Sequence, residues 1–150
     1  MDKTFLVEQL AAKLRATVDQ IQRFADETRT EAKTGAARAV NLARATSARN
    51  EAAHAALEAL ESFRPRPLRK GEPIGVGALV EIEDGDAGKT LFLSPAGAGE
   101  ELTGPGGDGF FHVVTPSSPI GRAMLGKRVG DVIEVPMHGE ITEWTIVYAG

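Results

Sequence analysis

Few residues of this chain have the type and spacing that catalysis requires. Gly88-Lys89-Thr90 looks like the end of a phosphate-binding loop, but that motif needs a glycine five residues earlier, where the chain has Glu83. His54, His112 and His138 are far apart in the sequence and no cysteine accompanies them, so a zinc site is not expected. No Ser/His/Asp set stands out. We therefore expect no active site, metal or cofactor that belongs to this chain alone.

The composition is that of a globular chain with one domain or two small ones. The 150 residues are 42% hydrophobic and 25% charged, which excludes wholesale disorder. No apolar run approaches the ~18 residues of a membrane span, and the charged N-terminal residues are unlike a signal peptide, so a cytoplasmic protein is expected. The net charge of −4 is not that of a protein that grips nucleic acid unaided. A large protein partner is therefore favoured over free DNA.

Residues 1–63 have the pattern of an antiparallel coiled-coil hairpin. Thr4 can cap the first helix, which extends over about 24 residues or roughly 36 Å. Its heptad seam is Val7, Ala11, Leu14, Val18, Ile21 and Ala25, flanked by Leu6, Leu10 and Phe24. Gly35 is the only glycine among the first 70 residues, so the chain is expected to reverse within 28–35.

The second helix of the hairpin has a seam dominated by alanine. The predicted seam is Leu42, Ala45, Ala48 or Arg49, Ala52, Ala56, Ala59 and Phe63. Because small side chains bury little apolar area, this seam contributes little stability. Leu57, Leu60 and Phe63 are expected to anchor the hairpin at its base.

Residues 64–75 are predicted to be a linker, because three prolines and two glycines exclude another helix. The linker also carries a basic cluster. This cluster is either simply solvated or a contact patch for an acidic partner surface, and it consists of Arg64, Arg66, Arg69 and Lys70.

Residues 76–150 change to the period of two that is typical of strands. Strands are expected over 79–83, 90–93, 110–114, 132–135 and 141–148, with one helix over 120–125. This predicts an α+β fold: the helical hairpin, followed by a small antiparallel sheet with one short helix packed across it. The core candidates are Trp144, Ile146, Phe111, Val113, Leu125 and Val135.

The stretch 118–131 carries the strongest local signals of the chain. Ser118 can cap a short helix and Pro119 suits its first turn. Gly126 ends the helix, with two basic residues at the negative end of its dipole. An exposed Pro-Ile at the start of a helix would give partners a rigid apolar handle.

In order and spacing, this stretch and the strands around it resemble the C-terminal domain of the bacterial Gre transcription factors, the GreA/GreB family. The matching residues are Asp84-Gly85, Ser-Pro-Ile-Gly at 118–121, Leu-Gly-Lys at 125–127, Gly-Asp at 130–131, Val135-Pro136, Gly139 and Trp144-Thr145-Ile146. The resemblance covers residues 75–150 and implies an FKBP-like fold. It implies RNA polymerase core as the partner, with nucleic acid contacted only indirectly within the elongation complex. The residues that would dock on the rim of the polymerase secondary channel are Ser118, Pro119, Ile120 and Gly121.

The resemblance also implies that the hairpin tip presents carboxylates to the polymerase active site, where acids can share the Mg²⁺ held by the polymerase. The family tip reads Asp-Leu-x-Glu-Asn-x-Glu-Tyr, and the chain has Thr-Arg-Thr-Glu-Ala-Lys-Thr-Gly at 28–35, so Glu31 alone matches. Asp26 and Glu27 are further tip candidates, because Glu27 and Glu31 share a face if the helix continues. Two basic residues in the same turn predict weak dication binding. A solvated loop of mixed charge is the alternative.

These expectations describe a monomeric, Gre-like elongation factor that is not itself an enzyme. It would modulate elongation or the cleavage of backtracked transcripts, lending at most acidic residues to the polymerase. One alternative is an inhibitor that occupies the channel without stimulating cleavage. Two others are an interaction module outside the polymerase, such as a regulator of nucleotide metabolism, and a homo-oligomer formed through the heptad seam.

Overall fold

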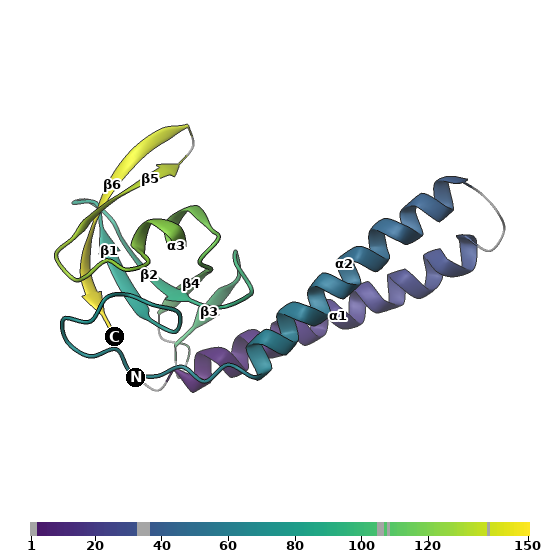
Figure 1. Cartoon of the computed structure of the whole chain (residues 1–150), viewed down its shortest axis with the longest axis horizontal. Helices are drawn as coiled ribbons and strands as arrows, with labels where there is room; N and C mark the ends of the chain where they lie inside the picture. The colour runs from purple at the N-terminus through teal and green to yellow at the C-terminus, as the bar shows by residue number, and fades with distance from the viewer. Residues whose placement is uncertain (1–2, 33–36, 105–106, 108, 138) are drawn as a thin grey trace.

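The computed structural model describes residues 3–32, 37–104, 107, 109–137 and 139–150, with residues 28–32, 37–39 and 137 described by their backbone alone. Two long helices are followed by six strands and one short helix (Figure 1). The elements are α1 (Thr4–Ala32), α2 (Ala37–Glu61), β1 (Leu79–Glu83), β2 (Gly88–Leu93), β3 (Glu101–Thr103), β4 (Phe110–Val114), α3 (Pro119–Met124), β5 (Val132–Met137) and β6 (Glu140–Ala149). The predicted α+β class and the single short helix are confirmed.

The six strands form one sheet in the order β3-β4-β2-β1-β6-β5. Its neighbours are antiparallel except for β2 and β4, which run parallel with Leu91 opposite His112 and Leu93 opposite Val114. The sheet is therefore mixed, whereas the sequence predicted antiparallel pairing throughout. Strand β3 was not predicted, because three residues are too few to show a period of two.

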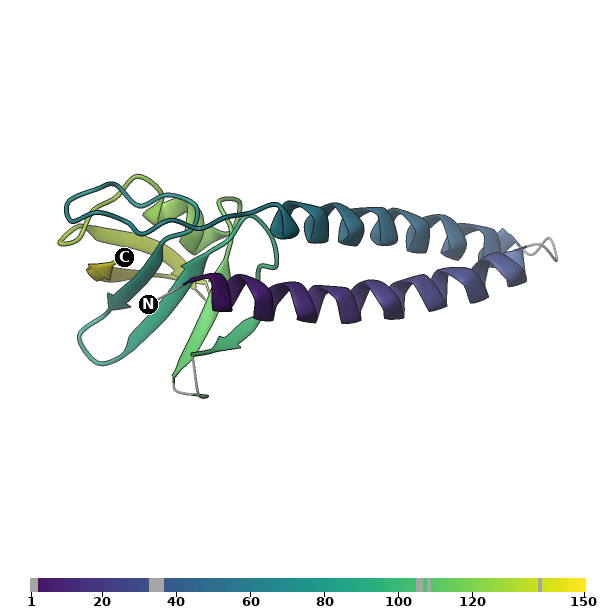
Figure 2. The same cartoon turned by 90° about the horizontal axis from the view of Figure 1, so that it is seen from below.

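The two long helices lie side by side and project from the sheet as a rod (Figure 2). The predicted seam of α1 is confirmed, with four of its residues buried and Leu14 and Ile21 half-buried. Phe24, predicted to flank this seam, is exposed. Helix α1 also continues through Ala32 and α2 begins at Ala37. The reversal therefore comes later than the start of the predicted range, and residues 33–36 lie outside the described residues.

The predicted seam of α2 is wrong by one residue over most of its length. The predicted seam residues Leu42, Ala45, Ala48, Arg49, Ala52 and Ala59 are exposed. A neighbouring stripe, shifted by one residue, faces α1 instead. That stripe contains two polar residues and consists of Ala43, Thr46, Asn50, Ala53, Leu57 and Leu60. Asn50 Nδ2 donates a hydrogen bond to Gln22 Oε1 at 2.9 Å across the seam. At Asn50, a hydrogen bond between the helices takes the place of apolar packing.

The base of the hairpin packs on one face of the sheet. Leu6 and Leu10 of α1 are fully buried in one cluster with Leu60 of α2 and with strand residues, including Phe92. The strand members of this cluster also include Leu79, Leu102, Phe111 and Val113. Leu57 and Phe63 pack against the same cluster, which confirms the predicted anchor.

Helix α3 covers the opposite face of the sheet. Alternate residues of the same strands form a second cluster there, because side chains of a strand alternate between its faces. Five of the six predicted core residues are buried, but Leu125 is 44% exposed and Met124 is buried in its place. Leu125 already lies beyond the last helical residue, where its backbone is extended, so the helical spacing behind that prediction no longer applies.

Lys3 connects the hairpin, the linker and the sheet. Its ammonium donates hydrogen bonds to the carbonyl oxygens of Arg66 at 2.6 Å, Gly77 at 2.5 Å and Gly150 at 3.1 Å. Burial, and to a smaller extent the nearby Arg66 charge, lower the pKa of Lys3. Because all three protons of the ammonium have acceptors, the buried side chain still holds the start of α1 against the end of β6.

None of the helices that the structure describes is long and apolar enough to cross a membrane.

Candidate functional site

The start of α3 is built around the hydroxyl group of Ser118. This oxygen accepts hydrogen bonds from the backbone N–H of Thr115 at 3.1 Å and of Gly121 at 3.3 Å, and it donates one to the carbonyl oxygen of Thr115 at 2.7 Å. Pro119 occupies the first helical turn, where a missing N–H costs nothing. The predicted cap is therefore confirmed, and the hydroxyl of Ser118 is engaged in shaping the turn.

The four predicted docking residues are adjacent but differently exposed. Pro119 is exposed and Ile120 is half-buried against the α3 face of the sheet. Gly121 is buried, and a Cβ atom at this position would lie 1.9 Å from the carbonyl oxygen of Thr115. Ser118 and Gly121 thus shape the turn, while Pro119 and the accessible part of Ile120 form its surface.

An apolar groove adjoins this turn. Its volume is about 320 Å³, and its walls come from β2, β4, β5, residues 98–99 and the start of α3. The side chains that matter most are Leu91, Val114, Pro119, Ile120, Val135 and Pro136. A groove of this kind can hold one or two apolar side chains of a protein partner.

A lysine and a histidine line the same groove. Lys89 Nζ lies 5.6 Å from the centre of the Trp144 ring, a distance at which a cation is attracted to the ring face. His112 Nδ1 lies 3.6 Å from Glu101 Oε1 of β3. From the sequence, Lys89 was a candidate only for a phosphate-binding loop and His112 only for a zinc site. The alternation of Lys89 with Leu91, and of His112 with Val114, is the signal that could have placed them here.

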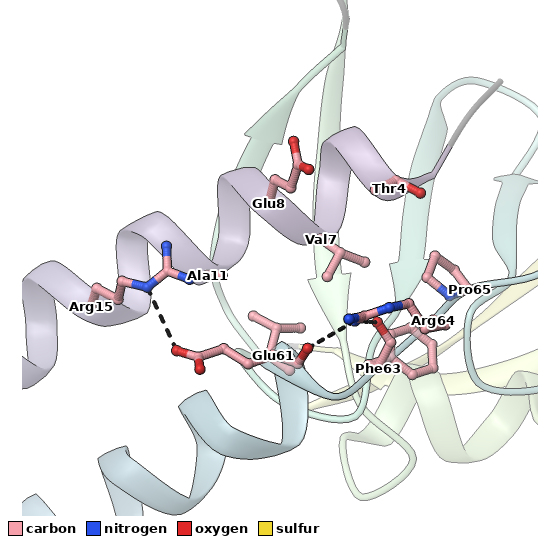
Figure 3. A pocket seen from close by; sticks show the side chains of 10 residues that line it. Thr4, Val7, Glu8, Ala11, Arg15, Glu61, Phe63, Arg64 and Pro65 are labelled. Carbon is pink, nitrogen blue, oxygen red and sulfur yellow. Dashed lines mark hydrogen bonds and ion pairs between the residues drawn. The ribbon is translucent and has the colours of Figure 1, made fainter.

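A second cavity, of about 480 Å³, lies at the base of the hairpin where α1 and α2 meet the linker (Figure 3). Arg15 Nε lies 3.6 Å from Glu61 Oε1, and Arg64 Nη1 donates a hydrogen bond of 2.8 Å to the carbonyl oxygen of Glu61. The cavity is otherwise lined by Glu8 and by small or apolar side chains. Its charges are balanced and exposed, and they do not converge on a point where a reacting atom could sit.

At the far end of the hairpin, the structure describes two of the three predicted tip acids in full. Asp26 and Glu27 are exposed, and Asp26 Oδ1 accepts a hydrogen bond from Gln22 Nε2 at 3.1 Å. The backbone is helical through Glu31, as its proposed shared face with Glu27 requires, but the side chain of Glu31 lies outside the described part. Among the described residues, no group of three or more His, Asp or Glu side chains could hold a metal ion.

Comparison with known proteins identifies the same half of the chain as the sequence motifs do. Residues 69–149 match the family model of the transcription elongation factor GreA/GreB C-terminal domain. The chain is 30% identical to the transcription elongation factor GreA of Clostridium novyi over 76 residues, 51% of this chain and 44% of the relative. It is 38% identical to the transcription inhibitor protein Gfh1 of Thermus aquaticus over 80 residues, 51% of this chain and 46% of the relative. The chain thus spans about half the length of these curated relatives.

A solved structure of the transcription factor Gfh1 is 26% identical to the chain, with a TM-score of 0.44, and the alignment covers 99% of this chain and 94% of the other. The family model alone spans more than half of the chain, from the linker to the end of β6. The chain belongs to the GreA/GreB family of transcription elongation factors.

Proposed function

We propose that this protein binds RNA polymerase at its secondary channel, with the start of α3 and the adjoining apolar groove as the docking surface. The supporting observation is that exposed Pro119 lines this groove, within the segment that matches the family. A proline held at the first turn of a capped helix is rigid, so little conformational entropy is lost when a partner covers it. Such a protein acts where transcription takes place, which in a bacterium is the cytoplasm.

In this proposal the hairpin enters the channel and modulates elongation. The proposal assigns no cation site to the hairpin itself, since no group of three or more His, Asp or Glu side chains among the described residues could hold a metal ion. Any transcript cleavage would be the activity of the polymerase, and no step of that reaction is assigned to this chain.

A second candidate function is inhibition of the polymerase by occupation of the channel. The tip sequence favours it, since Glu31 alone matches the acids of the family pattern and basic residues stand among them. The similarity to a relative named as a transcription inhibitor points in the same direction. A regulator that acts outside the polymerase is not favoured by any feature of the described residues.

Docking is tested by co-elution with core RNA polymerase from the same host, with a GreA protein as competitor. We expect Pro119→Glu to weaken binding about tenfold or more, because it places a charge on the wall of an apolar groove. Pro67→Glu, a change at an exposed linker proline, is the matched control and should bind as the wild type does. Equal binding by both variants would move the docking surface away from α3.

The two functions are separated in a backtracked elongation complex. If the protein is an inhibitor, elongation should become slower and transcript cleavage should stay unchanged. Combined alanine substitution of Asp26, Glu27 and Glu31 should then leave both results the same as with the wild type. If the wild type stimulates cleavage and the triple variant does not, the acids act in the channel and the inhibitor proposal fails.

A further inference from the structure

Tertiary packing brings two basic segments of the chain together. The linker folds back beside the sheet near the end of β6 (Figure 1), where its residues 66–74 meet the loop that follows α3. Arg128 Nε donates a hydrogen bond to the carbonyl oxygen of Gly71 at 3.0 Å. The backbone N–H of Ile74 donates to the carbonyl oxygen of Lys127 at 2.7 Å. These bonds join segments that are more than 50 residues apart in the sequence.

Positive charge is concentrated in this region. Segments 66–72 and 127–131 contain five of the seven Lys and Arg residues found between 65 and 150, but only two of the twelve acids. The rest of this half of the chain is strongly acidic. The basic region is therefore a local exception in a unit whose net charge is negative.

Both acids of the region are already engaged. Glu72 accepts hydrogen bonds from Arg66 Nη2 at 2.8 Å and from the backbone N–H of Arg69 at 3.1 Å. These bonds, that from Arg66 foremost, hold the pKa of Glu72 below its usual range. Asp131 Oδ2 accepts from the backbone N–H of Arg128 at 2.8 Å. The side chains of Arg69, Lys70 and Lys127 make no ion pair with the other residues that the structure describes.

The basic residues adjoin an apolar groove of about 560 Å³. We call it the basic groove: Arg69 and Lys70 line it, and its other side chains are Leu68, Glu72, Val129, Val147, Tyr148 and Ala149. Val129 is 54% exposed and Tyr148 is 46% exposed. Large apolar side chains beside unpaired cations are a combination typical of protein interaction sites.

We propose that the basic groove binds an acidic protein segment that inserts an apolar side chain between Val129 and Tyr148. The charges of Arg69 and Lys70 complement carboxylates of such a segment. A nucleic acid fits less well, because its phosphates would extend over the acidic remainder of this unit. The basic groove is lined by the linker, Val129 and the end of β6, and it shares no residue with the groove at Pro119. This proposal therefore goes beyond the docking surface described above and does not depend on it.

The probe for the test is a 12-residue peptide of alternating Glu and Leu, titrated at low salt into ¹⁵N-labelled protein and followed by NMR. We expect the amide signals of Gly71, Val129 and Tyr148 to shift with the peptide, and those of Pro119's neighbours Ser118 and Ile120 to stay in place. The same peptide with Lys in place of Glu should cause no such shifts. An absence of shifts at millimolar peptide, or shifts confined to other surfaces, would overturn the proposal.

A pair of charge variants then tests the role of the two cations. Combined Arg69→Gln and Lys70→Gln should weaken peptide binding by roughly tenfold, since two charge contacts with the peptide are lost. Combined Arg44→Gln and Arg49→Gln removes the same charge from exposed positions of α2 and should leave binding unchanged. Equal affinity of the two double variants would refute the assignment. Tighter binding of a single-stranded oligonucleotide at the same residues would identify the groove as a nucleic-acid site and overturn it as well.

The polymerase is absent from this experiment, so its outcome is separate from that of the co-elution test. A protein that fails to bind polymerase but binds the acidic peptide at these residues would lose the proposed function and retain the basic groove. The reverse result would retain the docking surface at α3 alone.

Discussion

Gly121 and Thr115 approach so closely that no side chain fits between them: a Cβ atom on Gly121 would lie 1.9 Å from the carbonyl oxygen of Thr115. That same oxygen accepts the hydrogen bond of the Ser118 hydroxyl. The contact therefore fixes the turn that presents Pro119 to solvent. Backbone atoms form the obstacle, so the turn cannot relax by rotating a side chain.

Gly121→Ala is expected to lower the free energy of unfolding by about 2 kcal/mol or more, because the turn must shift to relieve the clash. Gly75→Ala is the matched control, since a Cβ atom on Gly75 meets nothing within 4 Å, and it should change stability by less than about 0.5 kcal/mol. Urea denaturation followed by circular dichroism measures both. Equal stability of the two variants would show that the turn is not constrained as described.

Leu10 links the hairpin to the sheet, because it is fully buried in the cluster that contains Phe92. We expect Leu10→Ala to cost roughly 2–5 kcal/mol through lost apolar burial and a residual cavity. Leu42→Ala removes the same atoms from a residue that is 42% exposed on α2 and should cost much less. Thermal denaturation of the two variants makes the comparison. A similar loss in both would mean that the hairpin base is not a shared core.

The hydrogen bond between Gln22 and Asn50 allows a test of how much stability is lost when only one partner of a polar contact is removed. Gln22→Leu removes the partner of a half-buried amide and is expected to destabilise the hairpin by roughly 1–3 kcal/mol. Adding Asn50→Leu replaces both polar groups by apolar ones and should restore stability to the wild-type value or above it. Denaturant titrations of the two single variants and the double variant test this as a cycle. Additive losses in the double variant would contradict it.

We expect an acid in the turn between β1 and β2 to make the stability of the protein depend on pH. Asp84 Oδ1 accepts hydrogen bonds from the backbone N–H of Ala87 at 2.8 Å and of Asp86 at 3.0 Å, and these bonds lower the pKa of Asp84. A carboxylate whose pKa is lowered on folding stabilises the protein above its unfolded pKa of about 4. That stabilisation is lost as the pH falls through the folded value.

We therefore expect Asp84→Ala to be less stable than the wild type at pH 7, with the difference shrinking steadily below pH about 4. Asp86→Ala, which keeps the side chain of Asp84 and its two backbone partners in place, is the control. Melting temperatures at a series of pH values provide the measurement. A difference between wild type and Asp84→Ala that persists unchanged at low pH would contradict the assigned cause.

The sequence by itself determined the features that depend on neighbours along the chain. Strand 79–83, strand 110–114 and the seam of α1 were all predicted where the structure has them. The cap at Ser118 was also predicted, since capping depends on residue types only a few positions apart. The same local signals carried the family resemblance, which the comparison of residues 69–149 confirms.

Where the local sequence signals are weak, the tertiary structure alone decided which residues are buried and which strands pair. Helix α2 is so rich in alanine that several stripes look equally apolar, and packing against α1 selected the one with Thr46 and Asn50. The parallel pairing of β2 with β4 and the addition of β3 depend on which strand edges are free. No pattern within a single strand contains that information.

The candidate site also has a part that the sequence predicted and a part that only the tertiary structure decided. Its turn was predicted from Ser118 and Pro119, whereas its groove required β2, β4, β5 and the start of α3 to come together. The basic groove likewise exists because the linker folds back onto Arg128. Neighbouring residues determine the turns, the helix caps and the spacing of apolar residues in each element, since the groups involved lie within a few residues of one another. Which surfaces meet is decided by burying the most apolar area of the whole chain at once, and that choice appears only in the folded molecule.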